Sequence, residues 1–268
     1  MSVEPQGVPV RLRALALPVE HGSWGFLLEP IVLGLLLCPT PAGAWLAVAA
    51  VCAFLARHPL KLVLGDRRRG TRSPRTALAA RFASAYAASA LVALAAALAL
   101  SSPHVSVPLL LAAPLAAFAL LRDASGRSRD VAAELSGAAA LCASVGAIAL
   151  AGGWSMPAAL LLWLVLAARS ATAILYVRAR LRLDRGVGSG TGLVVACHAL
   201  LLFAGAWLAA LAALPWLAVV ALATLLARAA HGVSKRRAML KPKQLGRQEL
   251  AFGSLVVGLL ALGYALGV

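Results

Sequence analysis

Nine apolar segments joined by short connections run through almost the whole chain and constrain its fold more than any other feature. A helix that spans a membrane needs about 20 largely apolar residues. The predicted spans, in chain order, are 23–38, 43–64, 77–100, 106–121, 131–151, 156–176, 190–211, 214–230 and 249–267. We therefore expect an all-α, polytopic bundle of transmembrane helices. A lead-in at residues 1–22 precedes a single membrane domain at residues 23–268.

The lysines and arginines predict how this bundle is oriented. Four connections carry neither residue: 39–42, 101–105, 152–155 and 212–213. The other four hold most of the 25 basic residues: 65–76, 122–130, 177–189 and 231–248. Short connections that are rich in Lys and Arg stay in the cytoplasm. The pattern predicts nine crossings, with a cytoplasmic N-terminus and a C-terminus on the outer side.

Composition supports a membrane protein over a nucleic-acid-binding protein. Hydrophobic residues make up 62% of the chain and charged residues 13%, whereas soluble domains carry about 25% charged residues. A net charge of +16 in a soluble protein would indicate nucleic acid. Here the positive-inside pattern accounts for it, with membrane lipids as the expected partners.

Of the charged residues that fall inside predicted spans, Glu29 and Arg169 are the first candidates for a functional site. Glu29 lies about two turns into the first span, and Arg169 lies about two turns inside the cytoplasmic end of the sixth. Charges in a membrane helix usually face a partner or a wet cavity. For Glu29 two alternatives stay open, namely an ion pair with Arg57 or Arg169 and a direct contact with a ligand. The planar guanidinium of Arg169 suits a phosphate or a carboxylate.

Two basic segments extend this candidate site toward the cytoplasm. The segment Arg57-His-Pro-Leu-Lys61 is followed by Asp66, and Tyr176, Arg178 and Arg182 follow Arg169 in the second segment. We expect the second segment to prolong the sixth helix out of the membrane. These arginines either bind an anionic headgroup or act only as signals for topology.

The sequence does not predict a metal or cofactor site. The four cysteines form no CxxC pair, and no HExxH or phosphate-binding glycine-rich motif is present. We expect no disulfide framework and no zinc site, and no cofactor is evident from the sequence, with Mg²⁺ left as an alternative that is considered below.

A resemblance to a known family comes from segments spread along the chain. The segment Pro18-Val-Glu-His-Gly-Ser-Trp-Gly-Phe-Leu-Leu-Glu-Pro30, which includes Glu20 and His21, resembles the YwiC-like family of bacterial membrane proteins. Arg57-His-Pro-Leu-Lys61, Ile174-Leu-Tyr-Val-Arg-Ala-Arg-Leu-Arg182 and Leu245-Gly-Arg-Gln-Glu249 fit the same family. The resemblance implies a multi-pass protein of the bacterial cytoplasmic (inner) membrane. It adds Glu20 and His21 to the candidate site residues, but implies no particular activity.

The chain is also similar in topology to UbiA-type intramembrane prenyltransferases. Those enzymes have nine helices, and their functional loops after the second and sixth hold a polyprenyl diphosphate through Mg²⁺ bound by Asp-rich motifs. Here Asp66 and Asp184 are the only acidic residues in the corresponding loops. A Mg²⁺ site needs several oxygen ligands, so one carboxylate in each loop does not favour the metal.

Three functions from different classes are considered, of which we expect the first and keep the other two as alternatives. The first is a prenyltransferase-like protein that holds an anionic isoprenoid or lipid headgroup with arginine, with or without catalysis. The second is a transporter of a small anion, for which an inverted repeat around a midplane path is expected. The third is a structural or assembly protein whose charges set only topology and lipid contacts.

Overall fold

The chain folds into an all-helical bundle. The computed structural model describes residues 12–17, 23–71, 73–188 and 190–268, and these residues contain no β-strand. The helices, in chain order, are α1 Leu12–Ala16, α2 Ser23–Leu37, α3 Pro41–Arg68, α4 Pro74–Ala99, η1 Pro103–Ser106, α5 Val107–Ala124, α6 Val131–Ala151, α7 Met156–Asp184, α8 Thr191–Ala210, α9 Trp216–Gly232 and α10 Pro242–Leu266. The predicted all-α fold is confirmed.

Each of the nine predicted spans corresponds to one of the helices α2–α10. Seven of these helices are long and apolar enough to cross a membrane, and two shorter apolar helices, Trp24–Leu37 and Trp216–Gly232, complete the set. The protein is therefore a multi-pass integral membrane protein. Its orientation across the membrane stays a prediction.

Several helices extend beyond the apolar stretch that predicted them. The longest, α7, runs on past residue 176 to Asp184, as the sequence predicts, and α10 begins at Pro242, before the predicted span at 249–267. Hydropathy detects the part of a helix that lies in lipid, whereas the backbone hydrogen bonds continue for as long as the local sequence allows.

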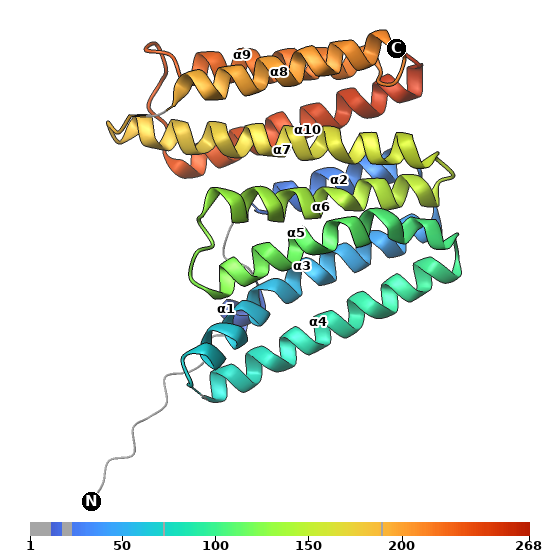
Figure 1. The fold of residues 1–268 in the computed structure, drawn as a ribbon, viewed down its shortest axis with the longest axis vertical. Coiled ribbons are helices and arrows are strands. Elements are labelled where there is room, and N and C mark those ends of the chain that lie inside the picture. Colours follow the sequence, from blue (N-terminus) through green and yellow to red (C-terminus); the bar gives the residue numbers. More distant parts are fainter. Residues whose placement is uncertain (1–11, 18–22, 72, 189) are drawn as a thin grey trace, which may run out of the picture.

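The helices are stacked along the long axis of the molecule (Figure 1). Helices α8 and α9 lie at one end, followed by α7 with α10, then α2 with α6, then α3 with α5, and α4 lies at the other end. Helix α2 is near the centre, where it packs against α6 and α10 and also touches α7.

The two edges of the bundle differ in charge. Figure 1 shows the helix ends that flank the basic connections (the C-terminal ends of α3, α5, α7 and α9) at one edge, and the C-terminus of the chain at the opposite edge. This separation agrees with the alternating loop charges of the sequence. We call the first edge the basic edge.

Apolar side chains fill the middle of the bundle and also cover much of its outside. Leu162, Leu166, Leu222 and Leu260 belong to a buried cluster in which α7, α9 and α10 meet. On the outer face of α8, by contrast, Phe203 is 69% exposed. The surface of a membrane protein that faces lipid must be apolar. The polar side chains within the membrane therefore interact with one another between the helices.

Candidate functional site

The two intramembrane charges predicted from the sequence lie together. The Nη1 atom of Arg169 on α7 donates a hydrogen bond to Oε2 of Glu29 on α2, at 2.5 Å. The two side chains are only 2% and 8% exposed. Of the alternatives left open for Glu29, the ion pair with Arg169 is present. A buried pair of this kind is strongly coupled, because removing one partner leaves the other charge without compensation.

A second ion pair lies next to the first. Arg228 on α9 donates a hydrogen bond from Nη1 to Oε1 of Glu249 on α10, and the side chains are 6% and 16% exposed. The guanidinium carbon of Arg228 lies 4.1 Å from the centre of the Tyr176 ring and 5.3 Å from that of Phe252. These cation–π contacts hold the plane of the guanidinium group against α7 and α10.

The two pairs form one cluster. Glu249 interacts electrostatically with both Glu29 and Arg169, so charges from α2, α7, α9 and α10 converge. We call Glu29, Arg169, Arg228 and Glu249 the buried charge cluster. Its formal charges cancel, which reduces the cost of burying them in a low-dielectric interior.

A glycine allows α10 to reach this cluster. Gly253 follows Glu249 by about one turn of α10 and faces the Glu29–Arg169 pair. A Cβ atom at this position would lie 1.9 Å from Oε1 of Glu29 and 3.0 Å from Nη2 of Arg169. Small residues let membrane helices approach closely, and here the approach encloses an ion pair.

The cluster has more hydrogen-bonding capacity than the protein itself uses. Among the described residues, the buried Nε and Nη2 atoms of both Arg169 and Arg228 have no hydrogen-bond partner. The same holds for the buried Oε2 atom of Glu249 and for Nε2 of His198 on α8. Buried polar groups are nearly always hydrogen-bonded, and an unsatisfied one costs about 1–3 kcal/mol. These atoms are therefore suited to hold a polar ligand.

Of the other predicted site residues on α7, Tyr176 joins the cluster and Arg178 does not. Tyr176 follows Arg169 by about two full helical turns and lies on the same face, whereas Arg178 follows it by about two and a half turns and points away. Arg178 instead donates hydrogen bonds to Oε2 of Glu134 on α6 (2.9 Å) and to the backbone oxygen of Arg129 (2.8 Å). Arg182 is exposed, and no hydrogen bond or ion pair joins its side chain to another described residue.

The predicted site residues on α3 also lie apart from the cluster. Arg57 forms an ion pair with Asp123 on α5, with 2.6 Å between its Nε atom and Oδ2. Lys61 is half-buried, and within the described parts of the chain no hydrogen bond or ion pair involves its side chain. Asp66 accepts hydrogen bonds from Thr76 (2.7 Å) and Arg69 (2.9 Å).

Two further predicted residues, Glu20 and His21, lie outside the described residues. A headgroup-binding role for them stays a prediction, as it does for Arg57, Lys61, Asp66, Arg178 and Arg182.

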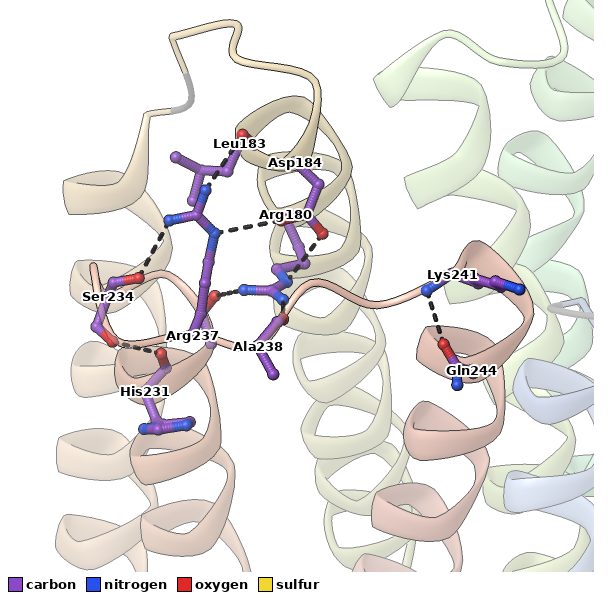
Figure 2. A network of polar contacts seen from close by, with 10 residues as sticks. Arg180, Leu183, Asp184, His231, Ser234, Arg237, Ala238, Lys241 and Gln244 are labelled. Carbon is purple, nitrogen blue, oxygen red and sulfur yellow. Dashed lines mark hydrogen bonds and ion pairs between the residues drawn. The ribbon is translucent and has the colours of Figure 1, made fainter.

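At the basic edge, arginines attach the connection between α9 and α10 to the end of α7 (Figure 2). Arg180, which is 1% exposed, donates to the backbone oxygens of Gly232 and Ala238 and forms an ion pair with Asp184. Arg237 donates to Oδ1 of Asp184 and to the backbone oxygen of Leu183, each at 3.2 Å. These contacts hold residues 233–241 against α7 and explain the burial of Arg180, which the sequence does not reveal.

The positions of the acidic side chains can be compared with what a Mg²⁺ site would require. Within the described ranges, no group of three or more His, Cys, Asp or Glu side chains is placed to hold a metal ion. Asp66 and Asp184 each bond to arginines close to them in space. Their surroundings are those of ion pairs with protein groups.

Sequence reasoning missed half of the cluster. Arg228 and Glu249 are intramembrane charges by the same criterion that selected Glu29 and Arg169, so the criterion applied to every span could have found them. No sequence signal distinguishes Gly253 from the other 22 glycines, because its role depends on which helices meet. The position of His198 near the cluster depends on how α8 packs, which the sequence does not reveal.

Comparison with known proteins identifies one relationship. The sequence model described as YwiC-like protein matches residues 17–149, which run from the lead-in through most of α6. The resemblance predicted from the sequence motifs is confirmed over those residues. No curated protein and no solved structure matches the chain.

Proposed function

We propose that the protein binds an anionic headgroup from within the membrane, since residues 17–149 match the YwiC-like family and the helices are those of an integral membrane protein. The headgroup belongs to an isoprenoid or another lipid, and it is bound from the cytoplasmic face. We place the protein in the bacterial inner membrane, with the basic edge toward the cytoplasm.

One observation carries this proposal, namely the unused donors of two buried arginines. Arg169 and Arg228 each use Nη1 for a carboxylate, while Nε and Nη2 remain without a partner among the described residues. The Nε and Nη2 hydrogens of a guanidinium group point in fixed directions that match two oxygens of a phosphate. Two such groups in one cluster provide an oxyanion site.

The surroundings favour an anion that arrives from the lipid. The net charge of +16 is concentrated in the connections at the basic edge, and this attracts anionic groups toward that edge. The aromatic rings of Tyr176 and Phe252 provide apolar surface beside Arg228, against which the first part of a hydrocarbon chain can pack.

A UbiA-like arrangement remains part of the proposal as a prediction about the fold. The connections after α3 and α7 both lie at the basic edge, as that arrangement requires. The candidate site differs from the UbiA pattern, because arginines and not aspartate-bound Mg²⁺ would hold the anionic group.

The proposal is tested by mass spectrometry of the lipids that co-purify with the detergent-solubilised protein. Each ion pair is neutralised as a pair, Glu29→Gln with Arg169→Gln and Arg228→Gln with Glu249→Gln, so that no buried charge is left alone. A matched control neutralises Arg122 and Asp130, an ion pair between α5 and the start of α6. A native elution profile on size exclusion confirms that each variant is folded.

We expect the wild type and the Arg122/Asp130 control to enrich the same phosphate-bearing lipid over the bulk membrane. Each cluster variant should lose at least about tenfold of it, since each charge-assisted hydrogen bond contributes about 1.5–3 kcal/mol. Equal amounts of bulk phospholipid in all four samples would overturn the proposal and favour a transporter of a small anion or a structural protein.

A further inference from the structure

The most informative unused group near the cluster is the imidazole of His198. This residue lies on α8, is 2% exposed, and has Nδ1 at 2.8 Å from the backbone oxygen of Val194. A carbonyl oxygen can only accept a hydrogen bond, so Nδ1 carries the proton. In the neutral imidazole Nε2 is then an acceptor. No described residue donates to it.

His198 is close to the buried charge cluster. It interacts electrostatically with both Arg228 and Arg169, and the interaction with Arg228 is the larger of the two. Val194, one turn earlier on α8, packs in the same buried apolar group as Tyr176 and Ala229, and these residues flank Arg228 in space and in sequence. His198 therefore lies on the buried face of α8 near the arginines whose guanidinium donors are unused.

The hydrogen-bond donors and acceptors that lack a partner indicate which kind of ligand would fit the site. Arg169 and Arg228 provide donors at Nε and Nη2, whereas His198 provides an acceptor at Nε2 and Glu249 provides one at Oε2. A phosphate diester at neutral pH has only acceptors, so it would satisfy the arginines and leave both acceptors unsatisfied. A phosphate monoester in its monoanionic form carries a P–O–H group and can satisfy one of them as well.

The net charge of the buried charge cluster also favours a phosphate monoester in its monoanionic form. The two arginines and two glutamates of the cluster sum to zero, so a bound dianion would leave two uncompensated negative charges in a buried site. A monoanion leaves one, which the basic edge partly offsets. The second pKa of a phosphate monoester is about 6, so forming the monoanion at neutral pH costs little free energy.

We infer that the site selects a phosphate monoester over a diester, with Nε2 of His198 accepting the hydrogen bond of the P–O–H group. This inference rests on the proposed function and specifies its ligand. The shared chemistry is a phosphate with one ionisable hydroxyl, which a membrane-embedded monoester and free inorganic phosphate both offer. His198 thereby becomes a specificity-determining residue of the site.

The test uses the full-length protein in detergent at about pH 6, where both protonation states of a monoester are populated. The probes are dodecyl phosphate, the methyl dodecyl phosphate diester and inorganic phosphate, with binding measured by isothermal titration calorimetry. Two variants separate the acceptor from the fold. In His198→Asn the amide can replace Nδ1 as donor to Val194 but offers nothing at the Nε2 position, whereas His198→Gln places an amide oxygen near that position.

We expect the wild type to bind the monoester at least about tenfold more tightly than the diester, the fold-change expected for one buried acceptor satisfied or left unsatisfied. His198→Asn should bind both probes with similar affinity, and His198→Gln should keep most of the preference. Inorganic phosphate that binds as tightly as dodecyl phosphate would support the same chemistry with the free ion as the ligand.

Two results would overturn the inference while leaving the proposed function intact: equal binding of monoester and diester by the wild type, or an unchanged preference in folded His198→Asn. The absence of binding by all three probes would count against the proposed function itself. The outcomes therefore distinguish a wrong ligand class from a wrong site.

Discussion

The Glu29–Arg169 pair should behave as a coupled unit that stabilises the contact between α2 and α7. Its side chains are 8% and 2% exposed, so each charge is almost wholly removed from solvent. Arg169→Gln alone leaves the Glu29 carboxylate buried without a counter-charge. Breaking a buried ion pair in this way costs about 3–5 kcal/mol.

The double variant Glu29→Gln with Arg169→Gln should recover much of this loss. Two amides can hydrogen-bond to each other, and no buried charge remains. We expect the double variant to be at least about 2 kcal/mol more stable than the sum of the two single changes predicts, because groups in direct contact couple by about 0.5–3 kcal/mol. The same cycle at Arg122 and Asp130, whose side chains are 31% and 40% exposed, should give about 0–1 kcal/mol.

The free energies of unfolding are measured by titrating SDS into detergent micelles and following the fluorescence of the six tryptophans. Strictly additive effects at Glu29 and Arg169, with a coupling no larger than that of the Arg122–Asp130 control, would refute the buried ion pair.

Three further predictions concern other parts of the molecule. Gly253→Ala should lower the unfolding midpoint in the same SDS titration, since its Cβ would clash with Glu29, whereas Gly258→Ala on the same helix, with no atom within 4 Å, should not. Arg180→Gln should make the segment 233–241 more sensitive to limited proteolysis by trypsin, because two backbone hydrogen bonds and an ion pair are lost. A fold-wide gain in trypsin cleavage would instead mean that the whole bundle is destabilised. Alkaline phosphatase fused after Val268 should be active and green fluorescent protein at the same place should be dark, because the charge pattern puts the C-terminus outside. The reverse result would invert the topology.

Helix number and helix placement could be predicted because both depend on local sequence. Apolar length determines which segments can lie in lipid, and each of the nine predicted spans has its helix. The ends of the helices were harder to predict. Helix α10, for example, starts at Pro242, before the predicted span at 249–267. A proline at the first turn begins a helix in polar sequence, where hydropathy gives no signal.

The candidate site could be predicted only in part, because it is built from four helices far apart in the chain. Glu29 and Arg169 were found as charges inside spans, and Arg169 was one of two partners considered for Glu29. The pairing of Arg178 was not predicted, since the place of a residue along a helix does not show which neighbouring helix its side chain faces. Its pairing with Glu134 depends on α6 lying along that side of α7.

The convergence of Arg228, Glu249 and His198 on the same place is a property of tertiary packing. Each residue taken alone has an ordinary explanation, such as a topology signal, a helix-end charge or a satisfied core histidine. Only their proximity to Arg169 shows an excess of hydrogen-bonding groups. A single sequence contains no signal that links them.

The most direct test of the proposed site is an electron cryomicroscopy map of the full chain, in nanodiscs made with lipid extracted from its host membrane. We expect a compact, non-protein density beside the Nε and Nη2 atoms of Arg169 and Arg228, continuous with a hydrocarbon chain that leads to the lipid. A map in which protein side chains or the backbone occupy those hydrogen-bonding positions would contradict a headgroup site and leave the cluster as a structural contact between helices.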